Sequence, residues 1–167
     1  MSVIHLPYTR QCFVCGAENP AGLQLRFRVE GDEIRFNFCP HQKHTGYQGV
    51  VHGGIIASAL DETMFWAAAF GPRRFFVSVD MNVRYARTVV AGQPHVLVAR
   101  ITGAKRKLCL TEAELRTADG HVCASATGTF FPLKPGEIPL SLEDFVIDPQ
   151  TLPAMEFFKS FRFRATS

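Results

Sequence analysis

Apolar and polar residues alternate in two short stretches near the start of the chain, over 24–30 and again over 33–39. Strict alternation places every second side chain on one face, which is typical of a strand buried on one side. Gly31-Asp32 lies between the two stretches and supplies turn residues. We therefore expect a β-hairpin here, followed by a polar loop over 40–51.

The pattern changes to helical spacing after this loop. Apolar residues recur at Ile56, Leu60 and Met64 within an alanine-rich stretch from 53 to about 70. The remaining faces of this stretch are largely apolar too, and a helix that is apolar nearly all round is a buried helix. Gly71-Pro72 predicts its end.

Alternation returns in the second half of the chain and predicts four longer strands. Asp119-Gly120, between the last two of these strands, is a strong hairpin signal. The basic stretch 103–107 is expected to form another turn. The four expected strands cover 75–85, 95–102, 108–117 and 121–131.

The expected order of elements is two strands, one long helix and about four further strands. An antiparallel sheet that curves around a single apolar helix would cover most of the helix surface. We therefore predict an α+β fold, with five to six antiparallel strands wrapped around one central helix. This domain would span 24–131, between an irregular segment, 1–23, and a C-terminal extension, 132–167. Open sheet edges favour pairing between copies of the chain, so we expect a dimer or a dimer of dimers.

The composition fits one ordinary globular domain and argues against several other classes of protein. The chain has 167 residues, of which 47% are hydrophobic and 20% are charged. A net charge of +3 is too small to indicate a nucleic-acid partner. No apolar run reaches the ~18 residues that cross a bilayer, and 1–10 lacks the apolar core of a signal peptide. Since five cysteines cannot all pair with one another, we expect a reduced, cytoplasmic protein without stable membrane association.

The start of the predicted helix contains two adjacent glycines, Gly53 and Gly54. The first backbone N–H groups of a helix lack partners within it and carry the positive end of the helix dipole. Glycine lets a ligand approach these groups closely. The segment is therefore a candidate donor site for a carbonyl oxygen that gains negative charge during a reaction.

Asp61 and Glu62 place two carboxyl groups in the middle of this apolar helix. A charge in apolar surroundings is costly unless it is paired or used. Adjacent helix residues point about 100° apart, so only one of the two faces a given cleft. A desolvated carboxylate can act as a general base or as a nucleophile, and Asp61 is the candidate, with a structural cap as the alternative. Glu62 is expected to be a hydrogen-bond partner or an interface residue.

The segment His52-Gly53-Gly54 is followed by Asp61, nine positions after the histidine, and later by Val77-Ser78-Val79-Asp80-Met81-Asn82. Earlier in the chain stands Cys12-Phe13-Val14-Cys15-Gly16. Over roughly 12–131, these motifs resemble the hotdog-fold thioesterases, especially the branch related to the phenylacetate-pathway thioesterase. The resemblance implies a hotdog fold and the hydrolysis of an acyl-CoA thioester to free acid and CoA, without a cofactor.

The resemblance also implies a role for each matched residue. Asp61 corresponds to the catalytic acid, which acts as a base on water or as a nucleophile, and Ser78 to a serine that helps to position the attacking water. Gly53 corresponds to the residue whose N–H polarises the thioester carbonyl, and His52 shapes that end of the site. In such enzymes the acid and the glycine come from different subunits. From the residues alone, His52 and Ser78 are also compatible with structural roles.

Six further residues are candidates for binding the acyl-CoA substrate. Many members of the family carry Asn or Gln where this chain has Gly46, and Gln48 could substitute for it. Arginine forks suit phosphate oxygens, so basic residues near strand ends are candidates for the CoA phosphates, although 105–107 is also compatible with a solvated turn. The six candidates are Gly54, Gln48, Arg84, Arg87, Lys105 and Arg106.

Other functions and other segments leave alternatives open. The 15 phenylalanines, with Trp66 and Met64 on the helix, favour a medium-chain or aromatic acyl group. Gly46 keeps open a non-catalytic acyl-CoA-binding or sensing protein of the same fold. A hotdog dehydratase or hydratase ranks last, because those enzymes usually pair a catalytic His with an acid in a different pattern. The aromatic and basic stretch 157–164 could be an interaction segment or a packing helix.

Cys12 and Cys15 have the spacing of half a zinc site. No second cysteine pair follows, so we expect no bound metal and two thiols packed in a loop. Cys109 and Cys123 lie on neighbouring expected strands and are predicted to be core residues. The residues that could complete four zinc ligands are Cys39, His41 and His44.

Overall fold

A single long helix, α1 (Gly53–Phe70), runs through the centre of the structure. The computed structural model describes residues 3–134 and 136–159. His52 precedes α1 in an extended conformation, and its side chain accepts a hydrogen bond from the Gly54 N–H, which caps the helix. The helix therefore begins and ends where the apolar spacing and the Gly71-Pro72 signal predict.

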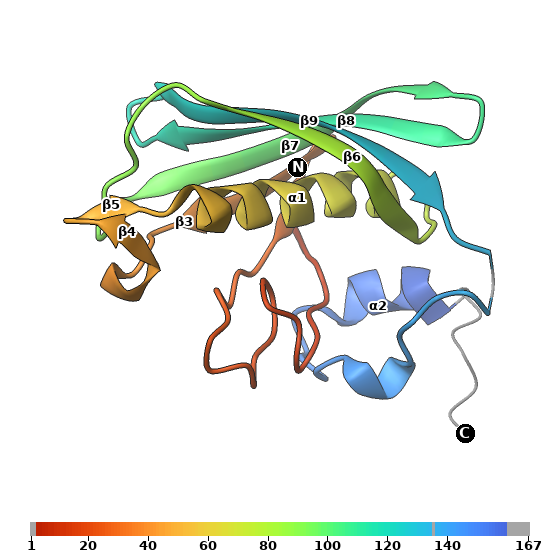
Figure 1. Cartoon of the computed structure of the whole chain (residues 1–167). Helices are drawn as coiled ribbons and strands as arrows, with labels where there is room; N and C mark the ends of the chain where they lie inside the picture. Colours follow the sequence, from red (N-terminus) through yellow and green to blue (C-terminus); the bar gives the residue numbers. More distant parts are fainter. Residues whose placement is uncertain (1–2, 135, 160–167) are drawn as a thin grey trace.

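Seven antiparallel strands form the main sheet, which curves over one side of α1 (Figure 1). Their order is β1-β2-β3-β7-β8-β9-β6, so β1 and β6 are the edge strands. β4 and β5 form a separate two-stranded sheet near the start of α1. The strands are β1 (Ile4–His5), β2 (Arg28–Glu30), β3 (Glu33–Phe38), β4 (Thr45–Tyr47), β5 (Val50–Val51), β6 (Phe76–Tyr85), β7 (His95–Lys105), β8 (Leu108–Thr117) and β9 (Val122–Pro132).

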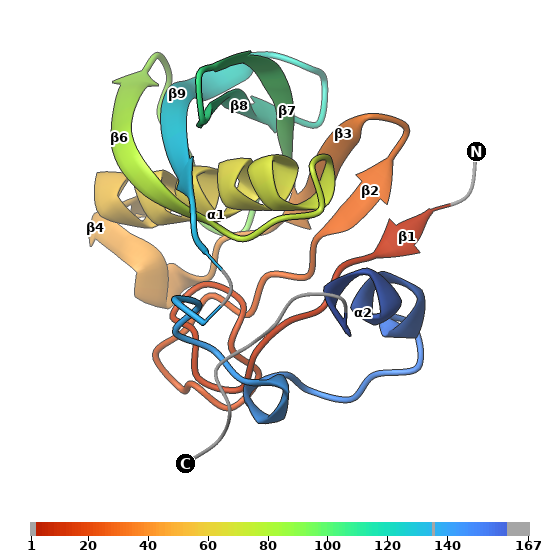
Figure 2. The ribbon, with the colours of Figure 1, turned by 90° about the vertical axis from the view of Figure 1, so that its right-hand side faces the viewer.

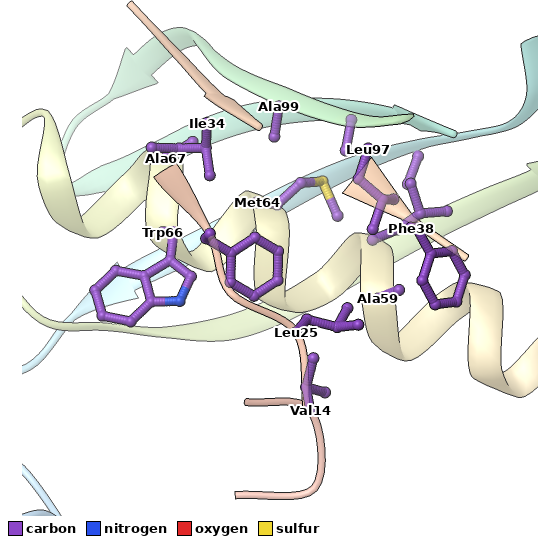
Figure 3. Close-up of a cluster of buried hydrophobic side chains, with 14 of the residues drawn as sticks. Val14, Leu25, Ile34, Phe38, Ala59, Met64, Trp66, Ala67, Leu97 and Ala99 are labelled. Atoms are coloured by element: carbon purple, nitrogen blue, oxygen red, sulfur yellow. The ribbon is translucent and has the colours of Figure 1, made fainter. Parts of the chain in front are cut away.

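The hydrophobic core lies between α1 and the middle of the sheet. α1 packs on β7 and β8, and the side chains of Leu60 and Met64 are fully buried in this contact. Figure 3 shows part of the cluster, with Met64 among residues from the strands and from the N-terminal segment. Cys109 and Cys123 are buried on the paired strands β8 and β9, as predicted.

The N-terminal segment and the C-terminal extension lie together on the other side of α1, so the helix sits between them and the sheet (Figure 2). The Arg10 N–H donates a hydrogen bond of 2.8 Å to the carbonyl oxygen of Asp144, and the Val146 N–H donates one of 3.0 Å to that of Tyr8. The extension also contains two short helices, η2 (Leu142–Asp144) and α2 (Leu152–Lys159). Neither α1 nor α2 combines the length and the apolar character needed to cross a membrane.

The structure confirms the α+β class and the antiparallel sheet around one long helix, but the number of strands was predicted wrongly. The sheet has seven strands rather than five to six, because Ile4–His5, in the segment expected to be irregular, pairs with β2. The strand expected over 24–30 is confined to its last three residues, Arg28–Glu30. Gln24 has a φ of 55°, in the left-handed region, which interrupts an extended run.

Two other expected boundaries also differ. β7 continues to Lys105, so the turn expected over 103–107 is confined to Arg106 and Lys107, with Arg106 at a φ of 58°. The stretch 40–51, expected to be a loop, contains the short helix η1 (Gln42–His44) and the strands β4 and β5. Of the stretch 157–164, residues 160–164 lie outside the described residues.

Candidate active site

A cavity of about 460 Å³ lies between α1, the start of β6, the N-terminal segment and the C-terminal extension. This volume is within the roughly 300–1,000 Å³ range of small-molecule sites. Six aromatic side chains line it, together with the ionisable residues Asp61 and Glu62 of α1. Its aromatic walls are Phe65, Trp66, Phe75, Phe76, Phe130 and Phe145.

Asp61 is half-buried on the wall of this cavity, beside Ser78 of β6. Burial raises the pKa of the Asp61 carboxyl, and a hydrogen bond from the Ser78 side chain lowers it. The pairing of β6 with β9 shifts register between Ser78 and Asp80, which marks a β-bulge at this point. Such bulges re-aim side chains beside active sites. The geometry thus presents a desolvated, hydrogen-bonded carboxylate to an apolar cavity.

Glu62 lies about 100° further round α1 and faces the N-terminal loop. Its Oε1 atom is 4.0 Å from the Sγ atom of Cys12. Burial, with the nearby charge of Cys12 added, raises the pKa of Glu62 to about 8. The two adjacent carboxyl groups therefore have different surroundings, and Glu62 is in contact with the loop that precedes the sheet. The prediction that only one of them would face a given cleft was wrong, because the cavity is wide enough for both to line it.

Cys12 and Cys15 belong to this loop and also line the cavity. The hydrogen bond from the Cys15 thiol, together with backbone N–H groups, lowers the pKa of Cys12 to about 6 although burial opposes the shift. The N–H groups of Val14 and Cys15 lie 3.3 and 3.5 Å from Cys12 Sγ. The pKa of the Cys15 thiol is raised, first by its hydrogen bond to Cys12 and then by burial.

The two glycines at the start of α1 differ in the use of their N–H groups. The Gly54 N–H donates a hydrogen bond of 2.9 Å to Nδ1 of His52. Among the described residues, no hydrogen bond uses the Gly53 N–H, and the Tyr85 hydroxyl donates one of 2.9 Å to the Gly53 carbonyl oxygen. The Gly53 N–H therefore remains a free donor at the positive end of the helix dipole, whereas the Gly54 N–H is already bonded to His52.

Gly46 packs against the ring of His52. A Cβ atom at position 46 would lie 3.0 Å from Cδ2 and 3.4 Å from Cβ of His52. A larger residue here would displace the histidine that caps α1. The absence of a side chain at Gly46 is therefore part of how this chain positions His52.

Three comparisons agree on the relatives of this chain. The sequence model of the thioesterase superfamily matches residues 48–124. A crystal structure of a thioesterase superfamily protein superposes with a TM-score of 0.69 at 28% identity, over 73% of this chain and 60% of that one. The chain has the hotdog thioesterase fold.

Two curated proteins are also similar to this hotdog chain. An uncharacterised protein of Schizosaccharomyces pombe is 31% identical over 102 residues, which cover 56% of each chain. The medium/long-chain acyl-CoA thioesterase YigI of Salmonella typhimurium is 27% identical over 146 residues, 78% of this chain and 88% of that one. This chain spans less than two thirds of the length of the Schizosaccharomyces pombe relative and of the crystallised thioesterase superfamily protein.

The structure places Asp61 beside Ser78, but Gly53 of the same chain lies away from both. Gly53 lines a separate groove of about 430 Å³ at the start of α1, with Arg87 and Tyr85. Positions 53 and 61 are eight residues apart, which is about 12 Å along a helix axis at 1.5 Å per residue. Within one chain, the proposed acid and the proposed donor therefore belong to different cavities.

The remaining candidates for substrate binding lie at separate places on the surface of the protein. Gln48 lies exposed in the turn between β4 and β5, and Arg84 lies exposed near the end of β6. Lys105 and Arg106 are exposed at the β7–β8 turn. None of these four lines the cavity that contains Asp61.

The sequence alone did not reveal several residues of the two cavities. Tyr85 belongs to no motif that the sequence analysis identified, although its hydroxyl donates a hydrogen bond to the carbonyl oxygen of Gly53, the first residue of α1. Leu140 and Phe145 of the C-terminal extension close the cavity beside Asp61, and no periodic pattern marks them. The loop cysteines were visible through their Cys-x2-Cys spacing, but their position beside Glu62 depends on a contact across fifty residues.

Proposed function

We propose that this protein hydrolyses an acyl-CoA thioester to a free acid and CoA. One observation carries the proposal: the partly desolvated carboxylate of Asp61, hydrogen-bonded to Ser78, stands on the wall of an aromatic cavity of about 460 Å³. The similarity to an acyl-CoA thioesterase over 78% of this chain supports the same reaction. The Cys12–Gly16 and Val77–Asn82 motifs support the branch related to the phenylacetate-pathway thioesterase.

The chemistry requires a base, a donor to the carbonyl oxygen and a proton for the leaving group. Asp61 takes a proton from a water molecule held with the help of Ser78, and the water oxygen bonds to the thioester carbon. The Gly53 N–H donates to the carbonyl oxygen as that oxygen becomes negative. The C–S bond then breaks, and the CoA thiolate takes the proton from Asp61. In the alternative route Asp61 attacks the carbon itself and water cleaves the resulting anhydride.

A second copy of the chain would supply the Gly53 N–H. The edge strand β6 exposes 41% of Val77, 58% of Val79 and 52% of Tyr85, which is unusual for apolar side chains on one strand. One stripe of α1, from Gly54 to Asp61, is also incompletely buried. If a two-fold axis passed near Ala57, midway between positions 53 and 61, Gly53 of each copy would approach Asp61 of the other. These surfaces support a homodimer, or a dimer of dimers, with shared sites.

The acyl group would occupy the aromatic cavity and the nucleotide part of CoA would lie outside it. The aromatic walls support a medium-chain or aromatic acyl group. Arg87 lies in the same groove as Gly53, so it is the basic residue best placed to reach a CoA bound at that amide. We propose outer contacts to CoA for Arg84, Lys105, Arg106 and Gln48. His52 would shape the thioester end by holding the Gly54 N–H.

All five cysteines are unpaired, which supports a reducing compartment such as the cytoplasm. The net charge of +3 gives no support to a nucleic-acid partner.

The test is the release of free CoA from a panel of acyl-CoAs with two to sixteen carbons, together with phenylacetyl-CoA and benzoyl-CoA. Asp61→Asn removes the base while keeping size, and it should lower kcat about 10²- to 10⁴-fold on the best substrate. Asp32→Asn, in the exposed turn between β2 and β3, is the matched control and should keep wild-type activity. Equal rates for wild type and Asp61→Asn would remove Asp61 from the mechanism. Tight binding of acyl-CoA without release of CoA by the wild type would favour the binding or sensing function instead.

A further inference from the structure

We propose that Cys12, Cys15 and Glu62 form a binding site for a single Zn²⁺ ion, which fastens the N-terminal loop to α1. The two thiol sulfurs and a carboxylate oxygen of these residues all lie within 4.8 Å of one another. Two thiolates and a carboxylate are ligands that Zn²⁺ accepts in tetrahedral sites. The proposed site does not depend on the thioesterase reaction, and its test measures binding rather than turnover.

The spacing of the donor atoms fits one small ion. Zinc–sulfur bonds of about 2.3 Å and zinc–oxygen bonds of about 2.1 Å at a tetrahedral angle separate sulfur and oxygen by about 3.6 Å. In the structure, Cys12 Sγ and Glu62 Oε1 are 4.0 Å apart. A shift of a few tenths of an ångström in side-chain torsions would therefore bring both atoms to bonding distance.

The backbone of the loop holds the two cysteines in this position. The N–H groups of Val14 and Cys15 point at Cys12 Sγ, and the Gly16 N–H donates a hydrogen bond of 2.9 Å to the Cys12 carbonyl oxygen. A Cβ atom at Gly16 would lie 2.2 Å from that carbonyl oxygen, so the turn is closed as tightly as glycine allows. A turn that directs N–H groups at a cysteine sulfur stabilises a thiolate, the form that binds a metal.

Glu62 lacks a cationic partner that would explain its position. In the described part of the chain, none of the ion pairs includes Glu62. The ionisable groups that act on it are Cys12, Cys15 and Asp61, none of which carries positive charge. Buried carboxylates are normally paired with a cation or coordinate a metal. A divalent cation between Glu62 and the two sulfurs would supply positive charge and would take the place of the proton that burial keeps on this carboxyl.

The position of the site suggests what the ion would do. It would join residues fifty positions apart, and its binding free energy would add to the stability of the folded chain. The three ligand residues line the cavity that Asp61 also lines, so a water molecule from this cavity could take the fourth ligand position. Binding releases to solvent the protons that the two thiols and the Glu62 carboxyl still carry, so no oxidant or reductant is needed. The prediction of no metal rested on the missing second cysteine pair, and it considered only Cys39, His41 and His44 as further ligands. The structure places Glu62 beside the two thiols instead.

Cobalt binding to the full-length protein tests the proposal. Reduced, chelator-stripped protein is titrated with Co²⁺, and one equivalent should produce the near-ultraviolet absorption of thiolate-to-cobalt charge transfer, which Zn²⁺ then displaces. Cys12→Ser should abolish this absorption, and Glu62→Gln should weaken Co²⁺ binding tenfold or more. Cys39→Ser, at an exposed cysteine outside the cluster, is the matched control and should bind as the wild type does. Charge transfer that is absent from the wild type, or unchanged in Cys12→Ser, would overturn the proposal.

A second measurement uses only the wild-type chain, so it does not depend on whether the variants fold. Alkylation of the reduced protein with iodoacetamide is mapped by mass spectrometry with and without Zn²⁺. Zn²⁺ should slow the modification of Cys12 and Cys15 tenfold or more and leave Cys39 unaffected. Equal modification of Cys12 in the presence and absence of Zn²⁺ would contradict the site.

Discussion

Gly53 and Asp61 occupy the same helix, but eight residues separate them, which is about 12 Å along the helix axis. A thioester carbonyl within hydrogen-bond reach of the Gly53 N–H is therefore too far from the Asp61 carboxylate of the same chain. The proposed reaction needs both groups within about 3 Å of the reacting atoms. The separation consequently makes two copies of the chain a requirement of the mechanism, and this requirement can be tested directly.

Mixing two inactive variants should restore activity. Asp61→Asn and Gly53→Pro each disable every site of their own homodimer, whereas a hybrid dimer contains one site with both native residues. Random pairing makes half of the dimers hybrid, so the mixture should reach about one quarter of wild-type activity. The two variants are co-refolded or co-expressed, and CoA release is measured against each variant alone. A mixture as inactive as its components would show that the two residues do not act across an interface.

Gly53→Pro should lower kcat about 10²- to 10³-fold by removing one donor to the developing oxyanion. Proline is tolerated as the first residue of a helix, and His52, with φ −62° and ψ 136°, already has a conformation that can precede proline. Gly53→Ala keeps the N–H, and its Cβ would meet the Tyr85 ring at 3.4 Å, an ordinary contact. Kinetics and thermal melting of both variants separate the loss of the donor from steric effects. A similar loss in both would mean that the N–H is not the important group.

The central helix could be predicted closely because its signals are local. A continuous apolar pattern, a glycine pair at the start and Gly71-Pro72 at the end fix its bounds without any information from the rest of the chain. Leu108–Thr117 was likewise predicted at its observed bounds, since alternation and turn residues mark it on both sides. These two elements share strong hydrophobic periodicity and clear turn or helix-breaking residues at their ends.

The missed features all depend on contacts between distant segments. β1 has only two residues, so it carries no alternation of its own and exists through pairing with β2. The extension closes the cavity because Phe145 pairs with Thr9, at the opposite end of the chain. Glu62 likewise contacts the loop of Cys12 and Cys15 only because two distant segments of the chain pack together. The local sequence pattern could therefore predict Asp61 and the start of α1, but not the residues that form the walls of the cavity.

Ser78→Ala should lower kcat of CoA release about 10- to 100-fold, because hydrogen bonds to charged groups contribute about 1.5–3 kcal/mol. Ser78→Thr keeps the hydroxyl on a residue that suits a strand and should restore most of the activity. KM for the best acyl-CoA should change little in either variant, since Ser78 holds Asp61 and its water rather than the acyl group. Equal losses in the alanine and threonine variants would point to a packing role instead.

Leu140→Trp should shorten the acyl chain that the protein accepts. Leu140 is half-buried in the wall of the cavity, so the larger ring would fill part of its volume. Losing room for two methylene groups costs about 1.6 kcal/mol, which is more than tenfold in kcat/KM for long chains. Activity on acetyl-CoA should be kept. Leu142→Trp, at a position that is 48% exposed and outside the cavity wall, is the control and should leave the chain-length profile unchanged.

The contact between α1 and the sheet should dominate the stability of the fold. Leu60 is 0% exposed on α1 next to Asp61, and truncation to alanine leaves a cavity that the surrounding strands cannot close. Leu60→Ala should therefore lower the free energy of unfolding by about 2–5 kcal/mol. Leu152→Ala removes the same atoms at a position that is 48% exposed, on α2, and should change it by no more than about 0.5 kcal/mol. Urea unfolding of the two variants measures both values. Equal losses would mean that the C-terminal extension contributes as much to stability as the contact between α1 and the sheet.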